Sequence, residues 1–92
     1  MWYIFRGINR TKKEIYHGVS ETPNDSIDKC KLISETTAIK HWNYDRDDIS
    51  WKSVSNHITQ KTASEKAYVL EKSYSYRGRF KGPFKNIQTA GN

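Results

Sequence analysis

The sequence predicts a small α+β domain in which a three-stranded antiparallel sheet is flanked by helices. Two segments rich in aromatic and β-branched residues lie on either side of a polar stretch, which is typical of a hairpin. A capping box precedes an apolar stripe at helical spacing, which is typical of a helix. The 92 residues include 3 Trp, 6 Tyr and 3 Phe, too many aromatics for a disordered segment, and they suit one domain over residues 1–92.

The first expected element is an antiparallel hairpin with Tyr3 in one strand, Tyr16 in the other and a loop centred after Arg10. This register places Tyr16 opposite Phe5. It places Gly18 opposite Tyr3, so that both tyrosines project from one face of the sheet. A glycine inside a strand also indicates a bulge or the close approach of another backbone or a ligand.

Helices and a third strand are expected after the hairpin. Pro23 at a first helical position predicts a short helix, and residues 34–42 predict a helical turn or two. Residues 51–59 predict the third strand, because they contain apolar and β-tolerant residues. The capping box at residues 62–65 predicts the start of the main helix, and Gly78 predicts its end.

Charge indicates the class of partner. The chain carries 16 Lys and Arg against 10 Asp and Glu, a net charge of +6 that attracts polyanions. The excess is concentrated in residues 61–86, where basic and aromatic residues alternate toward the end. Nucleic acid is therefore the expected partner, DNA rather than RNA, although a basic soluble surface without a partner is the alternative. The candidate contacts are Lys72, Arg77, Arg79, Lys81 and Lys85.

Several other classes of protein are not favoured. The sequence contains no apolar run that suits a membrane span or a signal peptide, so we expect a cytoplasmic location and no membrane partner. The single cysteine, Cys30, cannot form an internal disulfide and has no zinc-ligand partners at close spacing. His41 lies near three aspartates, but their spacing is more typical of a solvated turn than of a metal site.

Motifs toward both ends of the chain occur in the order of a known family. Met1-Trp2-Tyr3 lies at the start of the first expected strand and Tyr16-His17-Gly18 lies on the second, and they resemble the two triplets that the GIY-YIG nuclease superfamily carries on adjacent strands, with Tyr3, Tyr16 and Gly18 at the matching positions. The family's later helix carries Ala-x-x-Leu-Glu, and Ala67-Tyr68-Val69-Leu70-Glu71 has the same form. A Pro-x-x-Asn follows in the family, and Pro83-Phe84-Lys85-Asn86 provides one. The resemblance covers nearly the whole chain.

The resemblance implies metal-assisted hydrolysis of phosphodiesters. Tyr3 or Tyr16 would position or deprotonate the attacking water, and Glu71 would hold Mg²⁺ or Mn²⁺. The family also places an arginine in the helix after the second triplet, where this chain offers only Lys29 and Lys31. A lysine presents a point charge to a phosphate rather than a planar fork. The resemblance therefore implies a nucleic-acid-binding domain with weak or absent hydrolysis, in which Lys29 replaces the arginine.

Other interpretations of the same residues stay open. Tyr3 and Tyr16 also suit a hairpin that half-buried aromatics stabilise, and Glu71 also suits the solvated edge of a helix. The chain is then a non-catalytic module that binds RNA or single strands, or a protein-interaction module that uses exposed Trp42 and Trp51. Metal dependence separates these classes, because a nuclease needs Mg²⁺ or Mn²⁺ and a binding module does not.

Overall fold

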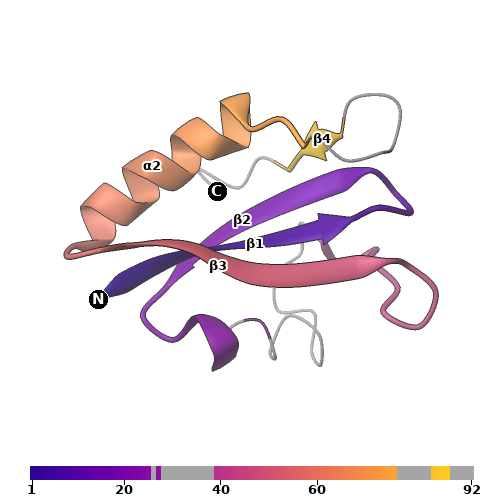
Figure 1. Cartoon of the computed structure of the whole chain (residues 1–92), viewed down its shortest axis with the longest axis horizontal. Helices are drawn as coiled ribbons and strands as arrows, with labels where there is room; N and C mark the ends of the chain where they lie inside the picture. Colours follow the sequence, from indigo (N-terminus) through magenta and orange to yellow (C-terminus); the bar gives the residue numbers. More distant parts are fainter. Residues whose placement is uncertain (26, 28–38, 77–83, 88–92) are drawn as a thin grey trace.

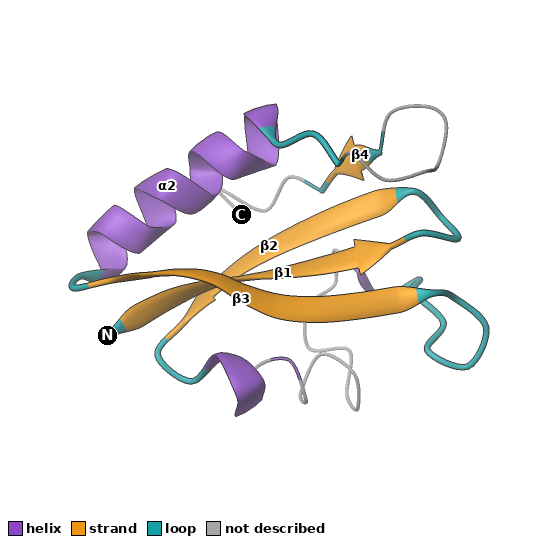
Figure 2. Ribbon diagram, viewed as in Figure 1, coloured by secondary structure: helices purple, strands orange, loops and turns teal. Residues whose placement is uncertain are grey.

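The computed structural model describes residues 1–25, 27, 39–76 and 84–87, and it shows an α+β fold with one main helix on a four-stranded mixed sheet (Figure 1). In chain order the elements are β1 (Trp2–Asn9), β2 (Glu14–Ser20), β3 (Ile49–His57), α2 (Gln60–Ser73) and β4 (Lys85–Asn86). The strand order across the sheet is β3-β1-β2-β4 (Figure 2). Within the described ranges, no helix is long and apolar enough to cross a membrane.

The α+β class is confirmed, whereas the purely antiparallel three-stranded sheet is wrong. β1 pairs antiparallel with both β2 and β3, as expected, but β4 adds a fourth strand that runs parallel to β2. Only Glu14 and Ile15 of β2 have partners in β4, and a two-residue strand is too short to leave a pattern in the sequence. β3 also begins at Ile49, two residues before the expected start.

The register of the β1–β2 hairpin differs from the expected one. Tyr16 lies opposite Gly7 rather than Phe5, while Phe5 lies opposite Gly18. The turn is displaced because the side chain of Asn9 accepts a hydrogen bond from the backbone of Lys12 (2.9 Å). The shift is an even number of residues, so the prediction that Tyr3 and Tyr16 share one sheet face is confirmed.

The boundaries of the main helix also differ from the expected ones. The N-cap is Thr59, not Thr62, and its hydroxyl accepts a hydrogen bond from the backbone N–H of Thr62 (3.2 Å). α2 ends at Ser73, and Tyr74 is extended. The expected end at Gly78 lies outside the described residues. The short helix at Pro23 is confirmed for the described part, because residues 23–25 are helical.

The sheet buries side chains on both of its faces. On one face, Ile4 packs against Ala63 and Ala67 of α2. On the other face, Phe5 and Tyr16 pack against residues of the connection between β2 and β3, which crosses below the sheet in Figure 1. Both faces of the central strand β1 are therefore covered.

Trp42 and Trp51 belong to the core, and the prediction that they are exposed is wrong. Trp42 is 5% exposed, and its indole N–H donates to Glu14 (3.0 Å). The ring of Trp51 lies within 5.9 Å of both Phe5 and Trp42, centroid to centroid, and covers Gly7. Trp42 is therefore buried and Trp51 is partly buried against the same cluster, so neither indole is an exposed anchor for another protein.

Gly18 is a point of close approach, although by a side chain rather than by a backbone or a ligand. A Cβ at Gly18 would lie 2.2 Å from Cζ of Phe5, which is itself buried. We predict that Gly18→Ala lowers the free energy of unfolding by about 1–3 kcal/mol, because the Phe5 ring has to move within a packed core. Urea unfolding measures this change. Ser53→Ala, at an exposed position opposite Phe5 on β3, is the control and should leave stability nearly unchanged. Equal stability of Gly18→Ala and the wild type would contradict the packing.

Candidate functional site

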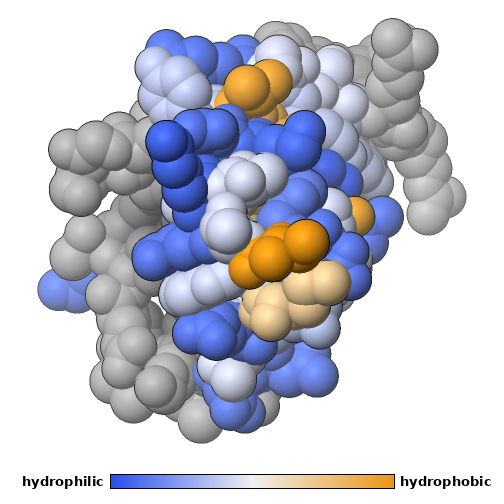
Figure 3. Space-filling model, turned by 90° about the vertical axis from the view of Figure 1, so that its left-hand side faces the viewer, coloured by the Kyte–Doolittle hydropathy of each residue, from blue (hydrophilic) through white to orange (hydrophobic). Residues whose placement is uncertain are grey.

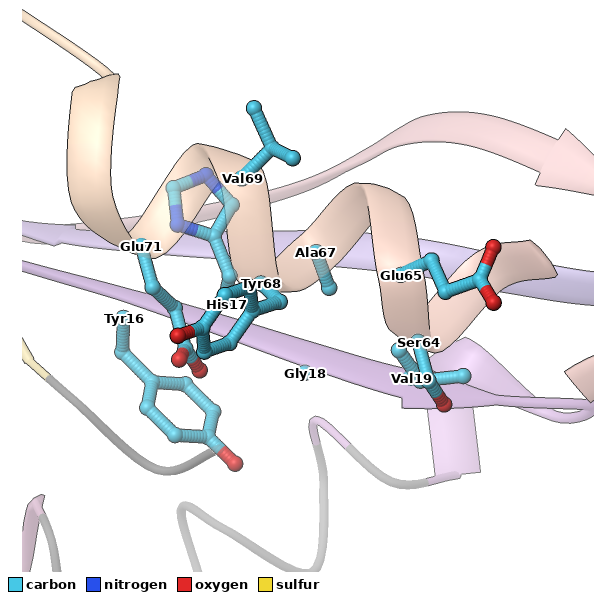
Figure 4. Close-up of a pocket in the computed structure, with 10 residues that line it drawn as sticks. All are labelled: Tyr16, His17, Gly18, Val19, Ser64, Glu65, Ala67, Tyr68, Val69 and Glu71. Atoms are coloured by element: carbon cyan, nitrogen blue, oxygen red, sulfur yellow. The ribbon is translucent and has the colours of Figure 1, made fainter. Parts of the chain in front are cut away.

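A pocket lies between β2 and α2, and we call it the β2–α2 pocket. It has a volume of about 670 Å³ and lies between residues 16–19 of β2 and residues 64–71 of α2. Figure 4 shows the two sets of side chains on either side of it. The paired segment of β4 reaches only Glu14 and Ile15, so the pocket adjoins the part of β2 that β4 leaves uncovered.

Glu71 enters the β2–α2 pocket from α2. The residue is 2% exposed, so the interpretation as a solvated helix glutamate is wrong. It lies one turn after Ala67, which packs on Ile4, and helical spacing therefore turns Glu71 toward the sheet. In Figure 4 its side chain descends from the helix toward the ring of Tyr16. Glu71 and Tyr16 thus line the same pocket, although Tyr16 also packs on the sheet face opposite α2 and its hydroxyl points away from Glu71 in Figure 4.

The two predicted tyrosines do not meet. Tyr16 lines the β2–α2 pocket and is 7% exposed, with its ring 6.1 Å from that of Phe5, centroid to centroid. Tyr3 lies opposite Ser20 and lines a different pocket, between β1 and β3. The observed register places Tyr3 four residues from Gly7, the partner of Tyr16, which is about 13 Å along the strand. Of the two, only Tyr16 is near Glu71.

His17 is a buried polar residue that the sequence did not mark as part of a site. It is 1% exposed and lines the β2–α2 pocket. Its Nε2 accepts a hydrogen bond from Nε of Arg6 (2.9 Å), and its ring packs edge-on against Tyr74, with 5.4 Å between centroids. Because Nε2 is an acceptor, the neutral ring carries its proton on Nδ1. Nδ1 has no hydrogen-bond partner among the described residues.

Burial controls the protonation of His17. Burial, and then the nearby charge of Arg6, lowers the pKa of His17 to about 4. The neutral imidazole is therefore the form present at neutral pH, so His17 brings no positive charge to the β2–α2 pocket.

The predicted basic contacts are only partly described. Lys72 is exposed on α2, with its ammonium 4.7 Å from the centroid of the Tyr68 ring, and Lys85 is exposed on β4. The elements that carry them, α2 and β4, lie on the same side of β2 in Figure 1. The other predicted residues, Lys29, Arg77, Arg79 and Lys81, lie outside the described residues.

The aspartates near His41 close a turn. The carboxylate of Asp47 accepts hydrogen bonds from Lys12 (2.8 Å), from the backbone of Asn43 (3.0 Å) and from Asn9 (2.8 Å). These bonds, that of Lys12 foremost, lower the pKa of Asp47 to about 2. Asp47 thus links the turn that contains Asn43 to the hairpin between β1 and β2, through its bonds to Asn9 and Lys12.

The structure brings together Tyr16, Gly18 and Glu71 from the predicted set, and it adds His17 to them. The sequence matches no protein-family model, and no curated protein or solved structure matches the chain. The chemistry of the β2–α2 pocket is therefore the basis for inferring function.

The buried histidine predicts a loss of stability in acid. The pKa of His17 is lower in the folded protein than the ordinary value of 6.5, so the unfolded chain binds more protons below that pH. The contribution of neutral His17 is complete above about pH 6.5 and is lost as the pH falls through about 4. We expect a loss of about 2 kcal/mol, after allowance for screening by water in the adjoining pocket.

Urea unfolding at about pH 7 and about pH 4 measures this loss. His17→Gln should reduce the difference between the two conditions, because glutamine does not titrate. If His17→Gln shows the same difference as the wild type, titration of His17 does not control acid stability.

Proposed function

We propose that the chain is a nucleic-acid-binding domain of the GIY-YIG type in which metal-dependent hydrolysis of phosphodiesters is weak or absent. One observation carries this proposal: Tyr16 and Gly18 of the second triplet line the same pocket as Glu71 of the later helix. These residues are separated by more than fifty positions in the sequence, and the resemblance rests on the same residues.

The residues of the β2–α2 pocket suit a divalent ion bound through water. Mg²⁺ commonly binds one or two carboxylates together with waters and substrate phosphates. Glu71 supplies a carboxylate, and the described ranges contain no group of three or more histidine, cysteine or acidic residues that could hold a metal. Bound Mg²⁺ or Mn²⁺ would supply charge for the phosphate, with Glu71 as its ligand. Tyr16 would orient the water on the opposite side of the pocket.

Hydrolysis of a phosphodiester also needs a cation that stabilises charge in the transition state. No arginine lines the β2–α2 pocket among the described residues, and Arg6 donates Nε to His17 from the other side of the imidazole. Phosphoryl transfer depends on positioned charge, and the loss of one such donor costs about 10²- to 10³-fold in rate. This is why we propose binding with feeble hydrolysis rather than an efficient nuclease.

A protein-interaction module has less support. Trp42 and Trp51 are packed in the core. The exposed large hydrophobic residues include Ile58 and Val69, and the face drawn in Figure 3 is mostly hydrophilic with small, separate hydrophobic areas. Interaction surfaces usually contain larger contiguous apolar patches.

We predict that purified protein cleaves supercoiled DNA or structured RNA slowly at best in Mg²⁺ or Mn²⁺. Any cleavage should disappear in Glu71→Gln, because the change removes the proposed metal ligand. Gel assays over time measure the rate, and Glu65→Gln is the control, because Glu65 lines the same pocket but is exposed. Rapid, multiple-turnover cleavage that requires Glu71 would refute the claim of feeble hydrolysis. Cleavage unaffected by Glu71→Gln would refute the metal ligand.

We also predict that basic residues of segment 61–86 supply most of the affinity for nucleic acid. Lys72→Gln and Lys85→Gln should each lower the slope of log affinity against log salt by about 1, if each lysine contacts a phosphate. Fluorescence anisotropy over a salt series measures the slope. Lys40→Gln, at an exposed position in the connection between β2 and β3, is the matched control. An affinity that did not change with salt would exclude this mode of binding.

A further inference from the structure

Another pocket, distinct from the one that Tyr3 lines, contains three cationic side chains, and we call it the β1–β3 pocket. It has a volume of about 250 Å³ and lies under the end of α2, with Arg6, Arg10, Lys52, Tyr74 and Tyr76 among its lining residues. Among the described residues, no acidic residue is part of its lining. Arg6 and Lys52 are paired across β1 and β3, and Arg10 follows at the end of β1. Strand pairing therefore fixes these charges close together.

Arg6 is the innermost of the three cations. It is 9% exposed, and its guanidinium carbon lies 3.7 Å from the centroid of the Tyr74 ring. Its one hydrogen bond within the described part of the chain runs from Nε to His17, which leaves the four N–H bonds of the terminal nitrogens without an acceptor there. Burial lowers the pKa of Arg6. Arg6 has no anionic hydrogen-bond partner among the described residues, and its terminal nitrogens face the pocket, where water or an anion can reach them.

Arg10 and Lys52 are the outer cations of the pocket. Arg10 donates Nε to the hydroxyl of Tyr76 (3.1 Å) and lies 3.5 Å from a carboxylate oxygen of Asp48. The side chain of Asp48 is 65% exposed, so this ion pair is at the surface and is screened by water. Lys52 is exposed at the rim. The titratable groups that face the cavity are therefore three cations and two phenols, with one exposed carboxylate beside Arg10.

We infer that the β1–β3 pocket binds the phosphates of a single strand of nucleic acid, with Arg6 holding one phosphate and Arg10 or Lys52 the next. Arg6 lies in β1 and Arg10 directly follows that strand, so their Cα atoms are about 13 Å apart. Cations spaced along a strand in this way suit a ligand with successive phosphates. Tyr74 and Tyr76 place aromatic rings beside these cations, the combination that proteins use to bind single strands.

The β1–β3 pocket is separate from the proposed nuclease site. Glu71 and Tyr16 line the β2–α2 pocket, and neither lines this one. The inference shares with the proposed function only the class of ligand and requires neither metal nor hydrolysis. Binding at the β1–β3 pocket should therefore persist in EDTA and in Glu71→Gln.

The test measures binding of a short, fluorescent oligothymidylate by anisotropy in EDTA, over a salt series. Lys52→Gln and Arg10→Gln should each weaken binding and lower the salt slope by about 0.7, the value for one phosphate contact on a single strand. Tyr76→Leu should weaken binding about tenfold if a base stacks there. Arg46→Gln, an exposed arginine in the connection between β2 and β3, is the matched control and should bind as the wild type does. Thermal melts establish that each variant is folded.

Four results would overturn the inference. If the double variant of Arg10 and Lys52 bound as tightly as the wild type, the protein would still bind nucleic acid, but the β1–β3 pocket would not be the binding site. Equal affinity for the duplex of the same sequence would exclude a preference for single strands. Displacement of the oligonucleotide by inorganic phosphate as readily as by unlabelled oligonucleotide would show a site for free phosphate. Absence of any binding by the wild type would overturn both this inference and the proposed function.

Discussion

The two-sided pairing of β1 is the constraint on which the rest of the structure depends. β1 lies between β2 and β3, and its side chains alternate between the helix face and the face covered by the connection between β2 and β3. Ile4, Arg6 and Ile8 therefore meet α2 and the segment after it, while Phe5 and Gly7 meet the aromatic cluster. A slip of one residue would exchange the two sets, which would bring Arg6 into the aromatic cluster and expose Phe5 to the helix.

The bonded pair of Arg6 and His17 links the two pockets, because Arg6 lines one and His17 lines the other. A charge on the helix-facing side of a central strand cannot reach bulk water freely, and here it meets an imidazole on one neighbouring strand and a tyrosine ring after the helix. The small side chains Ala63 and Ala67 pack α2 against Ile4 of the same strand. The helix and the segment after it therefore each adjoin one of the two pockets.

The sequence predicted the elements that local periodicity defines. It did not predict the features of the fold that depend on a single long-range contact. The antiparallel hairpin and the main helix could be read from β-branched and helical patterns. The hairpin register could not, because it depends on the side chain of Asn9, which bonds both the turn and Asp47. The predicted meeting of Tyr16 and Glu71 came from a resemblance, since no spacing rule places them together. Arg6 and His17 were missed because a buried Arg–His pair leaves no motif, and only strand alternation in Trp2–Asn9 could have indicated that Arg6 points inward.

The short reach of β4 has a consequence for self-association. A sheet edge with unpaired backbone groups is a template onto which an extended segment of another molecule can add. β4 pairs with the first two residues of β2, and among the described residues no other strand pairs with the outer edge of the remainder of β2. Glu71 lines the pocket beside this stretch. A charged side chain next to a strand edge opposes the addition of another strand, so Glu71 would discourage growth of the sheet there.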